Sequence, residues 1–255
     1  MLIIQAGSAP AVIRDACDDI PDWFRRALAQ APSPVSPADV RVVRVFEGDA
    51  LPPPDPACPA VITGSWAMVT DRLPWSETTA QWIRDAMAAG APLLGVCYGH
   101  QLMAHALGGV VDYHPRGREL GCHDVRLHEA AHADPLLAGL PTHFKAHLTH
   151  EQSVLRLPEG ATVLASSDHD AHQIVRYGPR AVSTQFHPEF TPDVLRACIA
   201  RRAGQLASEG LDPQAMMDAA ADTPHARAVL HRYVAAFQPL APAPSCGAAH
   251  AIQTP

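Results

Sequence analysis

The segment Leu93-Leu-Gly-Val-Cys-Tyr-Gly-His-Gln101 joins a short apolar run, a cysteine between two glycines and the start of a helical pattern. Glycines next to a turn let the chain bend sharply and present the intervening side chain. We predict a strand over residues 92–96, a helix over residues 99–107 that Gly108-Gly109 ends, and Cys97 at the turn. Peptide dipoles at the start of a helix stabilise a thiolate and lower the pKa of its thiol. Cys97 is therefore the candidate nucleophile.

A second motif, Gln185-Phe-His-Pro-Glu-Phe190, follows the apolar run Ala181–Thr184. A nucleophilic thiol needs a base, and the base needs an orienting acid. In an extended chain, residues two apart point the same way, so His187 and Glu189 share a side. An isolated His-x-Glu pair is most often a surface pair. Its place after a late strand, in a chain that also holds the cysteine turn, favours His187 as base and Glu189 as its orienting acid.

The first half of the chain alternates strand and helix patterns, which predicts a mostly parallel sheet with helices on both faces. The expected elements besides those around Cys97 are strands at 2–5, 40–46 and 60–63 and helices at 18–30 and 77–89. The middle of the chain changes to short strand patterns separated by turns, which predicts an antiparallel addition to the sheet. These strands are expected at 124–127, 144–148, 162–166, 173–176 and 181–186.

From Thr191 the pattern is helical again, in pieces separated by Gly210, Pro213 and Pro224. We expect residues 1–237 to form one α/β domain. Residues 238–255 are rich in alanine and proline, and we expect them to form a flexible tail.

The composition excludes several classes of protein. The chain of 255 residues has 26 acidic and 19 basic residues, a net charge of −7, and no basic stripe, so nucleic-acid binding is not expected. No apolar run is long enough for a membrane helix, and the first residues, 1–5, do not resemble a signal peptide. We therefore expect a cytoplasmic protein.

The metal-binding residue types show no ligand pattern. None of the 6 cysteines forms a Cys-x-x-Cys pair, and the 15 histidines are scattered without a His-Glu-x-x-His motif. We expect no metal site, and we expect the four histidines between His114 and His132 to lie at the solvated surface. Cys58, Cys122 and Cys198 are expected to be structural.

The two motifs together resemble those of the class I, or triad, glutamine amidotransferases. The likeness is greatest to the glutaminase domain of GMP synthetase and its free-standing relatives, and it extends from about Leu2 to Thr191. It implies a flavodoxin-like class I glutaminase fold with Cys97, His187 and Glu189 as the catalytic triad.

The resemblance also implies residues that bind the substrate. Val61-Ile-Thr-Gly-Ser65 is similar to the family's oxyanion loop, but Ser65-Trp66 replaces a Gly-Pro pair, so the donor can be at Gly64 or at Ser65. The Tyr98 N–H, just after the nucleophile, would be the second donor. Gln101 resembles a residue that contacts glutamine. Thr149-His150 resembles a loop near the glutamine pocket, where His150 has either a substrate role or a packing role.

The implied reaction is hydrolysis of the glutamine side-chain amide to glutamate and ammonia, without a metal or an organic cofactor. In the family the ammonia is usually passed to a synthetase domain or a separate synthetase subunit, so such a subunit is an expected partner. An alternative is a stand-alone γ-glutamyl hydrolase or peptidase with the same triad. A third hypothesis is a non-catalytic regulatory subunit, which the intact set of Cys97, His187 and Glu189 disfavours.

Overall fold

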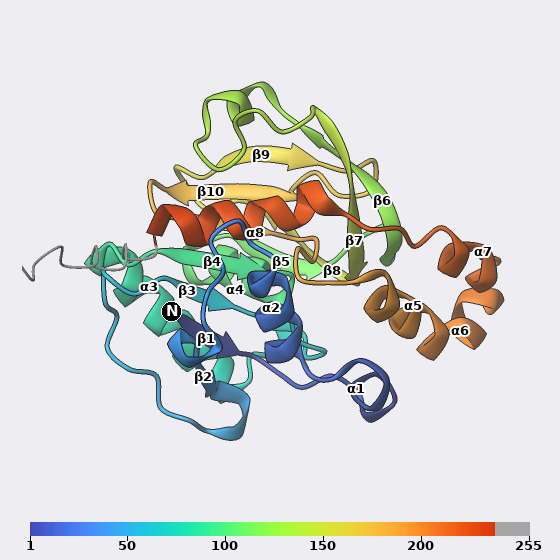
Figure 1. Ribbon diagram of the computed structural model, residues 1–255, viewed down its shortest axis with the longest axis horizontal. Coiled ribbons are helices and arrows are strands. Elements are labelled where there is room, and N and C mark those ends of the chain that lie inside the picture. Colours follow the sequence, from blue (N-terminus) through green and yellow to red (C-terminus); the bar gives the residue numbers. More distant parts are fainter. Residues whose placement is uncertain (238–255) are drawn as a thin grey trace, which may run out of the picture.

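The computed structural model describes residues 1–237, and the expected tail over 238–255 lies outside the described residues. One nine-stranded sheet forms the centre, in the order β2-β1-β3-β4-β11-β10-β9-β6-β7 (Figure 1). Its first five strands are parallel, and the last four are added in antiparallel fashion. The α/β fold class expected from the sequence is confirmed.

Four of the five parallel strands are buried at every residue because helices cover them on both sides, whereas the outermost parallel strand is partly exposed. The five are β1 (Leu2–Gln5), β2 (Arg41–Arg44), β3 (Ala60–Ile62), β4 (Leu93–Val96) and β11 (Ala181–Thr184). The antiparallel strands are β6 (Glu119–Leu127), β7 (His143–His150), β9 (Thr162–Ser166) and β10 (Ile174–Gly178). A separate two-stranded sheet pairs β5 (Val110–Tyr113) with β8 (Gln152–Arg156).

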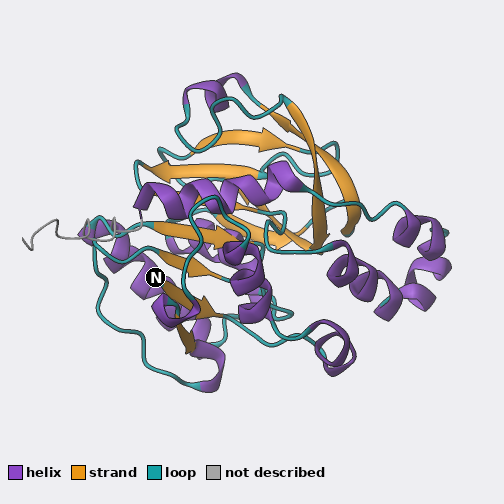
Figure 2. Ribbon diagram, in the orientation of Figure 1, coloured by secondary structure: helices purple, strands orange, loops and turns teal. Residues whose placement is uncertain are grey.

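Alternate residues of the parallel strands face two different hydrophobic cores, as the pleat of a strand requires. In β3, Val61 packs into one core, whereas Ala60 and Ile62 pack into the other. The first core takes in α1 (Ala11–Cys17), α2 (Ile20–Ala29), α5 (Pro192–Arg201) and α8 (Pro224–Phe237). The second takes in α3 (Pro74–Ala89) and α4 (Tyr98–Ala106). Figure 2 shows helices on both faces of the sheet.

Two short helices, α6 (Ala203–Ser208) and α7 (Pro213–Asp218), extend the chain beyond α5 at one end of the molecule (Figure 1). Asp212 caps α7 by accepting hydrogen bonds from the Gln214 and Ala215 amides, and Pro213 starts it. The chain then returns through α8 across the sheet. Within residues 1–237, no helix has both the length and the apolar character needed to cross a membrane.

Several boundaries differ from those expected. The strand expected over 40–46 ends at Arg44 and continues as a 3-10 turn, Val45–Glu47. The helix expected from Glu77 begins earlier, at Pro74, because proline suits a first helical turn. The short helix α1 and the strands β5 and β8 were not predicted. Val110 pairs with Arg156 in that small sheet, so only a distant partner defines these strands.

Candidate active site

Cys97 lies at the turn between β4 and α4, at the carboxyl end of the parallel strands. Its backbone has φ 52° and ψ −101°, a conformation that residues other than glycine rarely adopt. The neighbouring glycines allow the close packing that forces this turn. A Cβ at Gly99 would lie 2.3 Å from the Ile62 carbonyl oxygen, and one at Gly95 would lie 2.5 Å from the Gly99 carbonyl oxygen. The turn thus fixes the direction of the Cys97 side chain.

His187 and Glu189 follow β11, the strand that pairs with β4, so they enter the same pocket as Cys97. The Nδ1 of His187 donates a hydrogen bond to Glu189 Oε1 over 2.7 Å, and both side chains are buried. The ring stacks on Phe190, with 3.9 Å between the ring centroids. Within residues 1–237, the opposite nitrogen, Nε2, has no hydrogen-bond partner. The hydrogen bond to Glu189 and the stacking on Phe190 together hold the ring in one orientation.

Two opposing effects set the charge of His187. Burial alone would lower the pKa of the imidazole, but the negative charges of the Glu189 carboxylate and of Cys97 as a thiolate outweigh it and raise the pKa to about 10. The ring is therefore protonated at neutral pH. The imidazolium thus lies beside Cys97, whose Sγ is 3.9 Å from the Thr149 carbonyl oxygen.

The loop after β3 brings backbone amides next to Cys97. A Cβ at Gly64 would lie 3.1 Å from His187 Cε1 and 3.7 Å from Cys97 Cβ, so this part of the loop closely approaches both side chains. In the described part of the chain, the amides of Gly64, Ser65 and Tyr98 donate no hydrogen bond. Such free N–H groups beside a nucleophile can bind an oxyanion. The choice between Gly64 and Ser65 remains a prediction.

Gln101 lines the pocket, but its side-chain amide is used inside the protein. Its Nε2 donates to the Gln152 carbonyl (2.6 Å) and to Gln185 Oε1 (2.9 Å). Gln152, which the sequence analysis did not select, in turn accepts at its Oε1 from the Val69 amide (3.1 Å). These contacts connect the start of α4 to the segment that follows the loop with Gly64 and Ser65.

His150 lies at the end of β7, not in the loop expected from the sequence, because its pairing with β6 continues to Glu119. Its Nδ1 donates to the Gln152 carbonyl (3.0 Å), and its Nε2 lies 2.9 Å from the Glu119 carboxylate. Burial tends to raise the pKa of Glu119, but hydrogen bonds from His150 and Ser167 hold it below its usual value. Both ring nitrogens of His150 are thus engaged, which favours the packing role over the substrate role.

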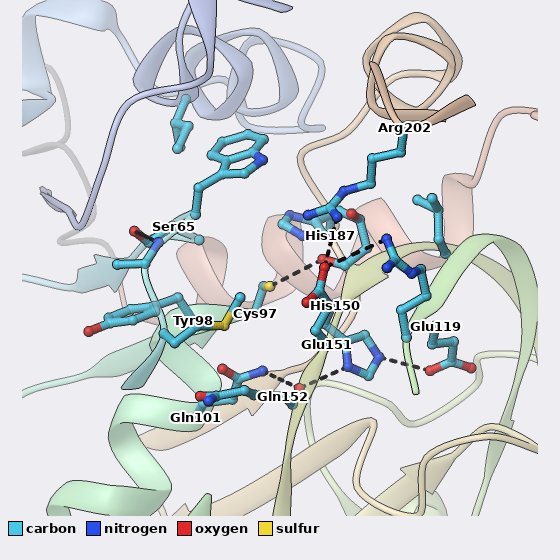
Figure 3. A pocket seen from close by; sticks show the side chains of 18 of the residues that line it. Ser65, Cys97, Tyr98, Gln101, Glu119, His150, Glu151, Gln152, His187 and Arg202 are labelled. Carbon is cyan, nitrogen blue, oxygen red and sulfur yellow. Dashed lines mark hydrogen bonds and ion pairs between the residues drawn. The ribbon is translucent and has the colours of Figure 1, made fainter. Parts of the chain in front are cut away.

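All eight candidate residues line one pocket of about 690 Å³, open solvent at its mouth included (Figure 3). The sequence analysis missed two other parts of its wall. One part of the wall is apolar and consists of Ile20, Trp23 and Trp66. Another part is charged and consists of Arg118, Glu151 and Arg202. These residues come from distant segments, and none of them belongs to the two motifs around Cys97 and His187.

The fold and the pocket define an α/β protein whose site lies where parallel strands end. A family model described as "Glutamine amidotransferase class-I" matches residues 60–203. The chain belongs to this family of enzymes, and the predicted family and enzyme class are confirmed.

Proteins of different lengths are similar to this chain in sequence. A glutamine-hydrolyzing GMP synthase of Thermosipho africanus is 37% identical over 117 residues, which are 45% of this chain and 22% of the relative. The chain thus spans about a fifth of that relative's length. A glutamine amidotransferase-like protein of Salmonella typhimurium, YfeJ, is 34% identical over 173 residues, which are 64% of this chain and 70% of the relative.

Solved structures share the fold. A glutamine amidotransferase of Thermotoga maritima has a TM-score of 0.71 at 20% identity and matches 92% of this chain and 96% of its own. A glutamine amidotransferase of Methylobacillus flagellatus has a TM-score of 0.68 at 22% identity, over 97% and 98% of the two chains. At this identity the likeness concerns the fold alone.

Proposed function

We propose that the protein hydrolyses the side-chain amide of glutamine to glutamate and ammonia. The observation that carries the proposal is the meeting of Cys97, on its strained turn, with the buried His187–Glu189 pair in one pocket. The family membership supports the same reaction, and the GMP synthases among the relatives are named as glutamine-hydrolyzing.

In the proposed mechanism the Cys97 thiolate attacks the amide carbon. The oxygen becomes negative and is stabilised by the Tyr98 amide together with that of Gly64 or Ser65. The C–N bond breaks, and the leaving nitrogen takes a proton from the His187 imidazolium, so that ammonia departs. Neutral His187 then removes a proton from water, which attacks the thioester carbon. Glutamate leaves, and the thiolate and imidazolium are restored.

We further propose that the ammonia passes to a separate synthetase chain. The support is the likeness to a GMP synthase that is named for glutamine hydrolysis. A family relationship of this kind fits a glutaminase whose product is used elsewhere. Such a chain should turn over glutamine slowly alone, and a partner should raise kcat more than it lowers KM.

The test of the proposed nucleophile is Cys97→Ala. Glutamate release from glutamine should fall by roughly 10⁴-fold or more, because no other thiol lines the pocket. Cys122→Ala is the matched control, since Cys122 is only partly buried and lies outside the pocket. It should keep full activity. More than a few per cent of residual activity in Cys97→Ala would rule out the mechanism.

The apolar wall supports a second candidate, a γ-glutamyl hydrolase or peptidase. Ile20, Trp23 and Trp66 offer a surface that ammonia alone does not need, and Trp23 packs edge-on against Trp66 with 6.5 Å between the centroids. A panel of γ-glutamyl amides and peptides decides between the two. Rapid turnover of an apolar γ-glutamyl amide, with kcat/KM of about 10⁴ M⁻¹s⁻¹ or above and glutamine as a poor substrate, would select the second.

A further inference from the structure

One part of the pocket wall carries paired charges that the proposed mechanism does not use. Figure 3 shows Ser65 on one side of Cys97 and Glu151 and Arg202 on the other. The Arg202 Nη1 donates to Glu151 Oε1 over 2.8 Å. These side chains are 22% and 28% exposed, so a ligand in the pocket can reach both.

A second arginine, Arg118, also faces Glu151, with 3.6 Å between its Nη1 and Glu151 Oε1, but both terminal nitrogens of Arg118 donate hydrogen bonds to other residues. They donate to Gln205 (3.2 Å) and Glu209 (3.1 Å) of α6 and its C-terminal end. Within residues 1–237, Arg202 in contrast donates only to Glu151. Arg202 therefore keeps free N–H groups for a ligand, whereas Arg118 is held in place by protein groups.

We infer that Arg202 binds the α-carboxylate of the substrate and Glu151 its α-ammonium group. This inference rests on the proposed function. The side-chain amide of glutamine is uncharged and would lie at Cys97. The other end of the molecule carries one negative charge, on the α-carboxylate, and one positive charge, on the α-ammonium group. A guanidinium beside a carboxylate matches that end in sign and number, and an arginine can bind a carboxylate through two parallel hydrogen bonds.

The segment that follows the family match contributes to this part of the pocket only through Arg118. Arg202 lies at the junction of α5 and α6, at the edge of the family match, which ends at residue 203. Gln205 and Glu209, which hold Arg118, lie beyond that match. Arg202 and Glu151 thus both lie within the family match, whereas two of the groups that hold Arg118 come from the segment that follows it.

The experiment measures protection of Cys97 from alkylation by the diazo-ketone analogue of glutamine, followed by intact mass. Three compounds compete: glutamine, γ-aminobutyramide, which lacks the α-carboxylate, and glutaramic acid, which lacks the α-ammonium. In Arg202→Gln, glutamine should protect roughly 10- to 100-fold more weakly, and γ-aminobutyramide should protect as in the wild type. In Glu151→Gln, the advantage of glutamine over glutaramic acid should shrink.

Two controls keep the outcomes distinct. Arg201→Gln changes the neighbouring arginine, which is exposed and outside the pocket, and it should behave as the wild type. The iodoacetamide reaction rate of Cys97 should be equal in all variants, which shows that the nucleophile and the fold are intact. If glutamine protects Cys97 equally well in Arg202→Gln and in Arg201→Gln, the inference is wrong and the proposed function stands. If glutamine fails to protect the wild type at all, the proposed function is wrong, and the inference falls with it.

Discussion

The Glu189 carboxylate is the strongest of the influences that raise the pKa of His187, and this gives a test by pH. Glu189→Gln removes that carboxylate charge, so burial should lower the pKa of His187 from about 10 and leave the ring neutral over more of the pH range. The alkaline limb of kcat/KM should move to lower pH, and the rate at neutral pH should fall about 10²- to 10⁴-fold. A pH–rate profile checks this. Glu159→Gln, at an exposed glutamate, is the control.

The same shift has a consequence for stability. Since the folded-state pKa of His187 lies above its ordinary value of 6.5, protonation stabilises the fold fully below pH 6.5. The contribution should decline as the pH rises from 6.5 and disappear as it passes about 10. Denaturant unfolding of the wild type and Glu189→Gln across this range should therefore converge at high pH. Parallel curves would contradict the assignment.

Single residues were predictable from the sequence where their signal was local. Cys97 stands between glycines, and His187 and Glu189 share one short motif, so their neighbours in the chain were enough to select them. Their roles stay predictions. Arg202 and Glu151 were not selected, because they meet only through the approach of α5 to the end of β7. Arginine and glutamate also form ordinary surface ion pairs, and only its place in the pocket wall distinguishes the pair of Arg202 and Glu151.

The packing of α4 on the sheet gives a test at the level of elements. Gly99→Ala places a Cβ against the backbone of β3, so α4 must shift away from the sheet. We expect a loss of about 3 kcal/mol in the free energy of unfolding, together with a loss of activity, because Cys97 immediately precedes α4. Gly204→Ala in α6 has open space around the new Cβ and should stabilise by about 0.5 kcal/mol. Equal unfolding free energies for the two variants would contradict this account.

Elements with a strong apolar pattern were predicted and found, as for β1, β3 and β4. The pattern failed where an element depends on a distant partner. β5 and β8 have exposed apolar residues, Val110, Tyr113 and Leu155, and are stabilised by pairing across more than forty residues of chain. Likewise, β7 continues past the expected Leu148 to His150 because β6 supplies partners for the added residues.

The whole molecule depends on a helix that lies outside the family match. In α8, Leu230 is fully buried, and the Tyr233 hydroxyl donates to the Ala60 carbonyl over 3.0 Å. Leu230→Ala should lower the free energy of unfolding by about 3 kcal/mol. Val12→Ala removes an aliphatic side chain that is 63% exposed and should change it by less than about 0.5 kcal/mol. Urea unfolding of both variants measures the difference, and similar values would show that α8 contributes little.

For the whole molecule, the sequence predicted the architecture of the sheet, but not how far the C-terminal helices extend the fold. The alternation of strands and helices predicted the parallel sheet, and the short runs after it predicted the antiparallel addition; both are confirmed. The single domain over 1–237 and the flexible tail over 238–255 stay predictions. The small helices α6 and α7 have too few residues for a clear periodicity, so their place beside the pocket could not be foreseen.

The positive φ of Cys97 also bears on how this chain can change during evolution. A non-glycine residue in that conformation costs about 1–3 kcal/mol, which selection tolerates only while the thiol is useful. A lineage that lost the reaction would be free to relax this strain. Glycine adopts the conformation without it. Among inactive descendants we therefore expect glycine at position 97 more often than serine or alanine, and a survey of such sequences would reveal the bias.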